Sequence, residues 1–476
     1  MNSLLVKISI LSISLLTVMA SAAISPALAK IRQAFPGTDI TLIKLVLTLP
    51  SLLIIPFSLL GGWLASRMKK KTILLIGLVI YFLGGVGGGL AKNITQLLII
   101  RGIFGIGVGL IIPLSISLIA DFYEKQERAK MMGLSGSVSH FGGVVFLLLS
   151  GWLACMNWRY AFGVYGLSAL IMFTVFFWLP EPPAAQKKAA GTPGVKLPWQ
   201  IYWCAVIGGL MMVAFYAAPT NLAMFIENQQ EMYKSVTPLF KDKAELEASL
   251  QSGVISESVR ASFKDNGIII SGKASFSVKE PGKTWIIRDR SRQFVVTKGQ
   301  DVLVVSSERI GRPGIAGFYL STMTMVGVVS GIILAVLLRF LGPYCSVVGI
   351  AAMAIGYGLL AQTYSLAGVL VSMLCIGFSS GILMPILLLR VARITPETGR
   401  ALSMAIVSCG IYLGQFLSPV ILKAASAFPG QDVFRSQFNF LSAGLIAATV
   451  WGLVSAIQSA RSGGFEQYKS VKVPGH

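Results

Sequence analysis

The arginine Arg101 lies inside a long apolar run of this 476-residue sequence and is its clearest candidate for chemistry. Inserting an arginine into a bilayer-spanning helix costs about 2.5–3.5 kcal/mol, so such a residue usually makes a functional contact. Gly105 and Gly109 follow it at the spacing of one helical face. The alternative is a structural arginine that donates hydrogen bonds to main-chain carbonyl groups of a neighbouring helix.

Proton movement through an apolar segment would need a titratable side chain there, and His140 is the one such group that titrates near neutral pH. Gly136 and Gly143 lie on its helical face. A carboxylate is the usual proton carrier in such a segment, but all 19 Asp and Glu residues lie outside the centres of the apolar runs. His140 is therefore a coupling candidate. The competing interpretation is a histidine that hydrogen-bonds at a tight helix contact.

Lys44 opens another apolar run, on a polar stripe that continues through Thr48 and Ser51. Its ammonium could attract an anion into a cavity, or it could extend to the aqueous interface. Further polar side chains lie within apolar runs: Thr17, Ser21, Tyr216, Asn221, Tyr412 and Gln415. Each alone is more often a helix-packing contact than a ligand. Together they describe a mildly polar, net-positive cavity that suits neutral or anionic molecules.

The composition indicates the elements that hold these residues. Apolar residues make up 54% of the chain and charged residues 12%, against about 25% charged in a soluble domain. We therefore expect an all-α integral membrane protein rather than a cytosolic enzyme, a disordered chain or a disulfide scaffold. Twelve apolar runs are apparent, at residues 5–25, 42–65, 72–91, 96–120, 131–154, 159–179, 200–226, 315–338, 343–362, 366–389, 401–422 and 440–458. We expect the first to be a retained span; a cleaved signal peptide is the alternative.

The net charge of +21 comes from Lys and Arg residues that gather in alternate gaps between the runs. The positive-inside rule places those gaps, and both termini, in the cytoplasm. The partner of this charge is then the lipid bilayer and not nucleic acid. The five cysteines lack CxxC spacing and the chain has two His, so we expect no metal and no cofactor. No GxxxxGKS/T sequence occurs, and we expect no enzymatic activity.

Residues 227–312, between the seventh and eighth runs, have the composition of a soluble protein and hold 11 of the 19 acidic residues. Residues 242–250 predict a helix. Alternating apolar segments separated by turn signals predict five strands, at residues 267–271, 274–279, 285–288, 293–297 and 302–306. We expect a small β-rich extracytoplasmic domain; a disordered loop is the alternative.

The chain carries an internal repeat. Gly105, Gly109 and Pro113 are matched by Gly377, Gly381 and Pro385 at an offset of 272. Leu28-Ala29 matches Leu222-Ala223 at an offset of 194, and the difference between the two offsets is about the length of the insertion. Two homologous six-span halves are typical of transporters whose substrate binds between the halves, near mid-membrane. The alternative for each GxxxG alone is close helix packing.

These motifs resemble the twelve-span major facilitator superfamily, nearest its drug-efflux branch, over all but the insertion. The segment from Gly62 through Arg67 and Lys70 to Lys71 resembles the family's basic loop between spans 2 and 3, with Ser66 where the family has Asp. The stretches 101–107, 158–162 and 410–419 also resemble family elements. The fifth span keeps Gly143 of the antiporter motif, but Leu147-Leu148 replaces its central Gly-Pro.

The resemblance implies alternating access, with Gly62, Arg67 and Lys70 in a cytoplasmic latch. Replacement of the motif Asp by Ser66 implies a weaker latch, or one made through Asp121 or Glu124. The implied organisation is an N-terminal half (1–179), a linker (180–199), helix 7 (200–226), the insertion (227–312), helices 8–12 (313–460) and a tail (461–476).

The expected function is export of a small organic molecule from a bacterial cell through its plasma or inner membrane, by a monomer that is proton-coupled in one interpretation. Nutrient or metabolite uptake is the first alternative. The second is a membrane-anchored sensor whose insertion binds an extracytoplasmic partner.

Overall fold

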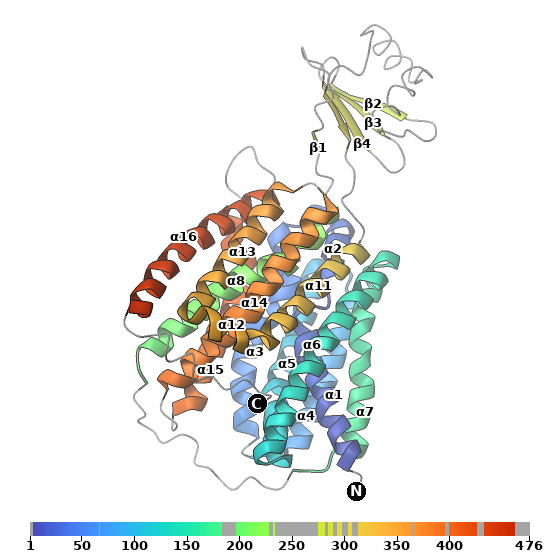
Figure 1. Cartoon of the computed structure of the whole chain (residues 1–476). Coiled ribbons are helices and arrows are strands. Elements are labelled where there is room, and N and C mark those ends of the chain that lie inside the picture. The colour runs from blue at the N-terminus through green and yellow to red at the C-terminus, as the bar shows by residue number, and fades with distance from the viewer. Residues whose placement is uncertain are drawn as a thin grey trace. The chain divides into compact units, whose positions relative to one another are not determined.

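The computed structural model describes residues 3–65, 67–182, 197–227, 232–233, 275–280, 284–288, 293–297, 303–306, 313–363, 365–395, 399–425 and 433–461. A helix occupies each of the twelve apolar runs (Figure 1). These long helices are α1 (Ser3–Ala22), α3 (Ile40–Leu64), α4 (Lys70–Gly87), α5 (Ile94–Phe122), α6 (Lys125–Met156), α7 (Leu167–Trp178), α8 (Gln200–Glu227), α11 (Pro313–Ile332), α13 (Cys345–Gln362), α14 (Leu366–Ile394), α15 (Arg400–Ala424) and α16 (Val433–Arg461). Short helices join them: η1 (Ser25–Ala27), α2 (Leu28–Ala34), η2 (Gly88–Leu90), η3 (Tyr160–Gly166), α12 (Leu334–Leu341) and η4 (Gly342–Tyr344).

Eleven helical segments in the described part of the chain are long and apolar enough to cross a membrane. In α1 the apolar stretch with described side chains, Leu4–Leu16, is shorter than these. Large apolar side chains point outward all around the bundle, such as Leu83, Leu90 and Trp451, which are 60–77% exposed. A surface of this kind has no favourable contact with water but a favourable one with lipid. The chain is a multi-pass membrane protein.

Several helix boundaries differ from the predicted runs, and in three cases the physical reason is clear. The eighth run was expected at 315–338, but α11 ends at Ile332 and the short helix α12 turns back, so that Leu334 and Leu338 pack against Ile382. The first turns of α6 carry charged residues, and those of α16 carry Arg435 and Gln437. Polar side chains lower the hydropathy of these turns, so both helices begin six or seven residues before their apolar runs.

The repeat is visible in the helices themselves. α5 and α14 are both 29 residues long, and each begins and ends 272 residues from the other. Their N-caps also correspond, because the side chain of Asn93 accepts a hydrogen bond from the backbone of Gln96, and that of Ser365 accepts one from the backbone of Gly368. Such caps satisfy backbone donors that a helix start leaves unpaired. The same local sequence logic therefore starts the corresponding helix in each half.

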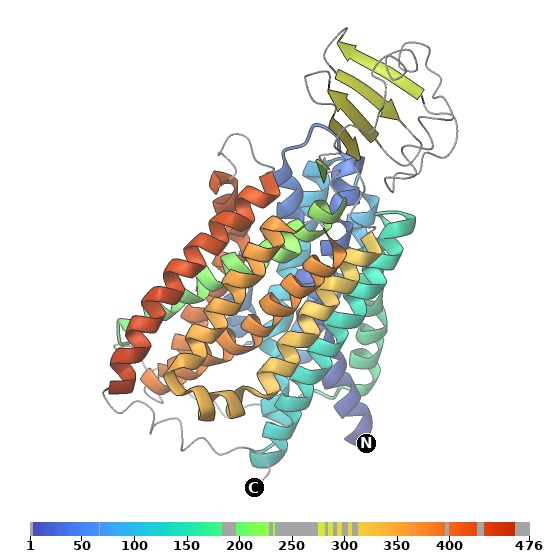
Figure 2. The same cartoon turned by 45° about the horizontal axis from the view of Figure 1, so that its top comes forward.

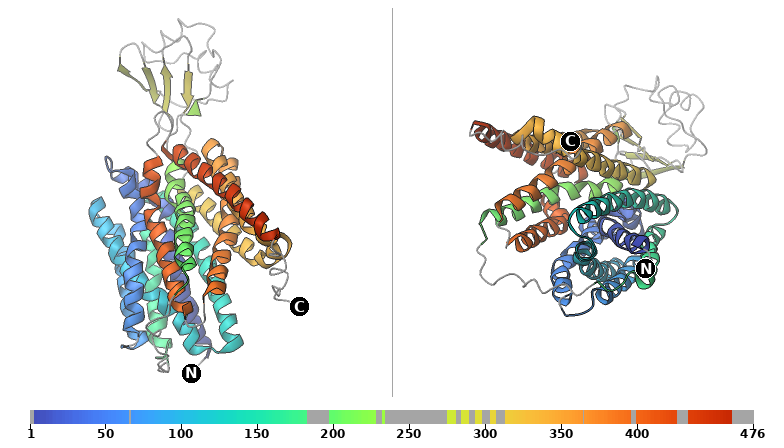
Figure 3. Two further views of the ribbon diagram at one scale, coloured as in Figure 1. Left: turned by 90° about the vertical axis from the view of Figure 1, so that its left-hand side faces the viewer. Right: turned by 60° about the horizontal axis from the view of Figure 1, so that its bottom comes forward.

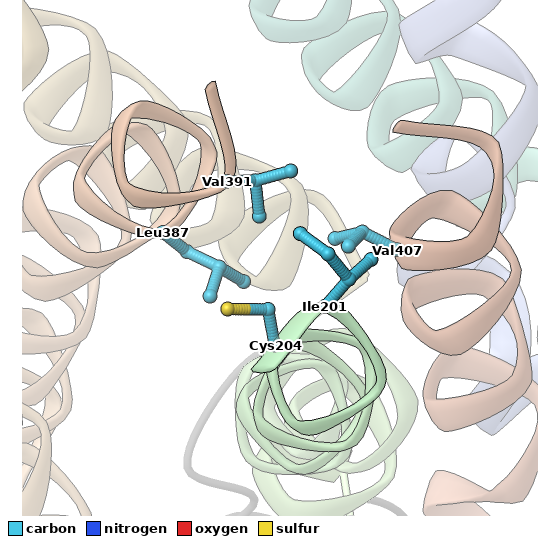
Figure 4. Packing of buried hydrophobic residues seen from close by; sticks show 5 residues of the cluster. All are labelled: Ile201, Cys204, Leu387, Val391 and Val407. Carbon is cyan, nitrogen blue, oxygen red and sulfur yellow. The ribbon is translucent and has the colours of Figure 1, made fainter. Parts of the chain in front are cut away.

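Each half is a bundle with its own core. In the N-terminal half α5 packs along α3 and α4, and in the C-terminal half α14 packs along α11 and α13 (Figure 2). Figure 4 shows one C-terminal core cluster, in which Ile201 and Cys204 of α8 meet Leu387 and Val391 of α14 and Val407 of α15. The two halves pack on each other mainly through α3 with α15 and α6 with α11 (Figure 3).

The bundle has two ends, each marked by different helix termini. α1 begins and α16 ends at one of them, which we call the terminus end (Figure 1). α8 ends and α11 begins at the opposite one, which we call the insertion end (Figures 1 and 2).

Residues 226–311 form a separate compact unit. Its described part is a five-stranded antiparallel sheet of β1 (Met232–Tyr233), β2 (Ser275–Glu280), β3 (Thr284–Arg288), β4 (Gln293–Thr297) and β5 (Leu303–Ser306), in the order β1-β5-β4-β3-β2. In sequence the sheet lies between α8 and α11. The predicted strand 267–271 and helix 242–250 lie outside the described residues, as do most of the linker 180–199 and of the tail 461–476.

Candidate functional site

The two halves are joined near the insertion end by polar contacts of α3. Lys44 Nζ donates to Gln437 Oε1 of α16 at 2.9 Å, and Thr48 Oγ1 donates to the carbonyl oxygen of Phe416 at 3.4 Å. At the start of α3, Asp39 and Lys423 form an ion pair at 2.6 Å. Lys44 and Thr48 belong to the polar stripe of α3 that was predicted from the residue spacing, whereas Asp39 is the N-cap of this helix. We call the surface where the halves meet the seam.

On the other side of the molecule, α6 and α11 close the seam. Ser321 Oγ donates to the carbonyl oxygen of Val144 at 3.0 Å, and the backbone nitrogen of Gly314 lies 3.3 Å from Cys155 Sγ. A Cβ at Gly317 would lie 2.6 Å from the Leu147 carbonyl oxygen. The Leu147-Leu148 pair that replaces the family's Gly-Pro thus lies at a direct contact between the halves.

Two residues of α6 nearer the terminus end are packed less closely. His140, one helical turn before Val144, is exposed, and a Cβ at Gly136 would meet no atom within 4 Å. Gly143 is buried. The seam contacts described above therefore concentrate at the insertion end. His140 is thus exposed while Gly143 of the same predicted face is buried, and both interpretations of His140 stay predictions.

Lys44 does not extend to an aqueous interface, since only 1% of the residue is exposed. Besides Gln437, its ammonium faces the ring of Phe434, whose centroid lies 5.4 Å away. Both partners come from the first turns of α16, a region that the hydropathy pattern missed. Arg435, between them in sequence, donates to the carbonyl oxygens of Ala361 and Thr363 and ties this turn to α13.

Arg101 lies in the interior of the N-terminal half. It is fully buried, and its Nε donates to the carbonyl oxygen of Val46 at 2.9 Å. The guanidinium lies 4.3 Å from the Phe104 ring centroid and 5.4 Å from that of Tyr165. Its two terminal nitrogens and the Tyr165 hydroxyl have no hydrogen-bond partner among the described residues. The Val46 contact is the one expected of a structural arginine, whereas the unpaired nitrogens leave donors for another group.

The remaining polar candidates lie in the C-terminal half and in α1. Tyr216 and Asn221 are buried in α8, and Gln415 is buried in α15, where Tyr412 is partly exposed. Asn221 Nδ2 donates to the Ala217 carbonyl oxygen at 2.9 Å. Asn221 Oδ1 and Gln415 Nε2 have no hydrogen-bond partner among the described residues. Thr17 and Ser21 belong to α1, but their side chains lie outside the described residues.

The repeated glycines pack helices within each half. A Cβ at Gly105 would lie 2.6 Å from the Pro50 carbonyl oxygen, and one at Gly109 would lie 2.9 Å from Phe57 Cβ, so α3 approaches α5 closely. Gly381 makes the corresponding approach to α11, against Gly327 and Ser330. Pro113 and Pro385 lie inside α5 and α14 at matching positions. The structure thus gives these glycines the packing role.

The loop after α3 is anchored by Asp121, one of the two acidic residues that the family resemblance suggested for the latch. Lys70 Nζ lies 2.6 Å from Asp121 Oδ2 and 2.7 Å from Ser117 Oγ, and both ionic side chains are only 12–15% exposed. Arg67 lies over the Trp63 ring at 4.2 Å. A Cβ at Gly62 would meet no atom within 4 Å. Ser66 lies outside the described residues.

The ion pair at the start of α3 has a defined electrostatic state. Donation from Lys423, and then from the backbone nitrogen of Thr41, holds the pKa of Asp39 down at about 2. Asp39 therefore stays ionised at any physiological pH. No group of three His, Cys, Asp or Glu side chains that could hold a metal occurs in the described part of the chain.

The fold and the seam define a class of protein: a helical membrane protein in which two bundles, with α5 and α14 as corresponding helices, meet along a polar interface. Comparison with known families agrees, because the model of the Major Facilitator Superfamily matches residues 10–256, just over half of the chain. The chain belongs to the major facilitator superfamily.

Relatives and solved structures agree with this family. A stretch of 115 residues is 31% identical to the multidrug transporter protein MdtP of Bacillus subtilis (strain 168), covering 24% of this chain and 21% of that protein. A stretch of 181 residues is 27% identical to the quinolone resistance protein NorA of Staphylococcus aureus (strain Mu50 / ATCC 700699), covering 37% and 46%. The chain thus spans less than half the length of either relative.

Two solved structures share the fold. The nucleoside transporter NupG has a TM-score of 0.63 at 11% identity, with 95% of this chain and 99% of that one covered. A D-xylose-proton symporter has a TM-score of 0.60 at 16% identity, with 95% and 97% covered.

Proposed function

We propose that this chain exports small organic molecules across a membrane by alternating access between its halves. The observation that carries the proposal is the polar seam, whose contacts gather at the insertion end between two homologous halves. Contacts of this kind, made by individual side chains, can break and re-form as the halves rock. Export rather than uptake is supported by the likeness to NorA and MdtP.

The proposed topology has twelve spans, with α1 as the first, and cytoplasmic termini. The insertion, an accessory domain, then faces the extracytoplasmic side. Basic residues on the loops of the terminus end support this orientation. A single cysteine placed at Ser291 should react with an impermeant reagent added outside the cell. Labelling only from the cytoplasmic side would contradict the proposed topology and place the insertion in the cytoplasm. Deletion of residues 232–307 should leave transport intact.

Alternating access is tested by locking the seam. In Gly314→Cys, the new Cβ would lie 3.4 Å from the native Cys155 Sγ, close enough for a disulfide after a small adjustment. Oxidation should stop transport and reduction should restore it. The matched control combines Gly314→Cys with Cys155→Ser and should be insensitive to oxidation. Transport that continues at full rate through the locked seam would reject alternating access.

Direction and coupling are tested in everted vesicles that carry the protein, a pH dye and an imposed proton gradient. Export predicts accumulation of a fluorescent substrate inside the everted vesicles; accumulation only in right-side-out vesicles would indicate uptake. The His140→Ala variant runs beside the wild type. Loss of substrate-dependent proton flux in the variant would assign coupling to His140. Unchanged proton flux would remove His140 from the mechanism.

A further inference from the structure

Lys44 is a buried cation without an anionic hydrogen-bond partner among the described residues. It is 1% exposed, yet its ammonium donates to the neutral amide of Gln437 and otherwise faces the Phe434 ring. The nearby carboxylate of Asp39 pairs with Lys423 instead. An ammonium has three N–H donors, and a buried charge without a counter-ion is costly. A residue kept in this state at the seam has a use for its charge.

Basic side chains outnumber acidic ones among the described residues of the insertion end. At the insertion end, the described charged side chains are seven basic residues and the single acid Asp39; the basic residues are Lys30, Arg32, Lys44, Lys92, Arg159, Lys423 and Arg435. Deeper in the N-terminal half, the buried Arg101 also has no acidic partner among the described residues. Clefts lined by one sign of charge concentrate ligands of the opposite sign. A cationic cargo that passes these basic residues would be repelled, and an anionic cargo would be attracted.

Opening of the insertion end makes the Lys44 ammonium available. The Lys44–Gln437 hydrogen bond joins α3 of one half to α16 of the other, so separation of the halves at this end breaks it. The buried Thr48 and Ser51 follow Lys44 on the same stripe and become exposed with it. A carboxylate, sulfonate or phosphate would then offer the ammonium a stronger, charge-assisted hydrogen bond than the Gln437 amide does.

We propose that the cargo is an organic anion and that Lys44 binds its anionic group while the insertion end is open. This inference rests on the export function proposed above. The cargo then leaves on the extracytoplasmic side, and closure of the insertion end returns the ammonium to Gln437. Lys44 is thereby a specificity-determining residue. The Lys44 ammonium changes partner between the Gln437 amide and the anionic group of the cargo. Binding of the cargo is thereby linked to opening and closing of the seam.

Two dyes with one ring system and opposite charge test the inference in energised everted vesicles. Fluorescein is anionic, and tetramethylrhodamine methyl ester is a cationic xanthene of similar size. Wild type should accumulate fluorescein and not the rhodamine. Lys44→Met should lower the fluorescein rate about tenfold or more, since a hydrogen bond to a charged group is worth about 1.5–3 kcal/mol. Lys44→Arg keeps the charge and should retain most of the rate.

Lys7→Met is the matched control, because it makes the same chemical change at an exposed lysine of α1, at the terminus end. It should leave both dye rates unchanged. All variants are compared at equal amounts of protein that elutes as a single species in detergent. Rhodamine transport that is indifferent to Lys44→Met would overturn the inference and leave export standing. Transport of neither dye by wild type would overturn the inference, because an exporter of organic anions is expected to carry fluorescein; the export function itself is tested by the direction of transport in everted and right-side-out vesicles.

Discussion

The hydroxyl of Ser25 donates a hydrogen bond to the carbonyl oxygen of Pro219, and the two residues are 194 positions apart, which is the offset of the repeat itself. Equivalent positions of the two halves therefore touch each other across the seam. A contact between equivalent positions is expected where two homologous halves meet on their pseudo-two-fold axis. Both residues are at the insertion-end side of their helices. The short helix η1, which carries Ser25, packs on α6 and α11, the two helices that also close the seam.

Gly105 of α5 should not tolerate a methyl group. In Gly105→Ala the new Cβ would lie 2.6 Å from the Pro50 carbonyl oxygen and 2.8 Å from Pro50 Cα, and backbone atoms yield little. We expect a loss of about 1–3 kcal/mol in stability, the usual cost of overpacking, visible as a lower melting temperature in detergent. Gly102→Ala is the control in the same helix, because its Cβ would meet no atom within 4 Å. Equal melting temperatures for the two variants would contradict the close approach of α3 and α5.

The pair of Lys70 and Asp121 should behave as one unit. Lys70→Ala and Asp121→Asn each leave a partly buried group without its partner, so each should cost about 1–3 kcal/mol. The double variant should cost little more than either single one, because the second change removes a partner already lost. Thermal unfolding of the four proteins completes the cycle. Lys69→Ala, at an exposed neighbour, should change stability by no more than about 0.5 kcal/mol. Simple additivity of the two single losses would show that the latch does not run through this pair.

Helix positions and the duplication could be predicted from the sequence because both are local patterns. Apolar runs of span length placed a helix in all twelve regions, and the glycine and proline spacing aligned α5 with α14. The end of α11 before Ile333 could not be predicted, because residues 315–341 contain no proline that would interrupt a helix. The first glycine with a positive φ after this point is Gly342, nine residues later. A continuous apolar run cannot distinguish one long helix from a helix that turns back onto the bundle.

The partner of Lys44 lay beyond sequence reasoning for a different reason. Gln437 is 393 residues away, in a turn whose polar side chains lowered the hydropathy and excluded it from the predicted twelfth run. Only the packing of the halves brings the two together. The stripe of Lys44, Thr48 and Ser51 could be predicted from its spacing, because it belongs to one helix. The surface that the stripe faces could not be predicted from its spacing.

The ion pair of Asp39 and Lys423 should not sense physiological pH. A depressed carboxyl pKa contributes stability above its unfolded value, near 4, and that contribution disappears as pH falls toward the folded value of about 2. Between pH 5 and 8 its contribution should therefore be constant. Asp39→Asn should change the transport rate by the same factor at every pH in this range. The plot of rate against pH should therefore keep the shape that it has for wild type. A changed shape would place the pH sensor at this pair and away from His140.

Arg101 should be needed for transport in a way that its charge alone does not explain. Its Nε donates to Val46 while the planar guanidinium packs on Phe104, and a lysine can do neither in the same geometry. Arg101→Ala should reduce the transport rate about tenfold or more, since it removes hydrogen bonds to a charged group worth about 1.5–3 kcal/mol. Arg101→Lys should be nearly as impaired. Both rates are measured in everted vesicles against the amount of protein that elutes as a single species. A lysine variant that transports normally would reduce the role of Arg101 to its charge, and normal flux in the alanine variant would remove it from the site.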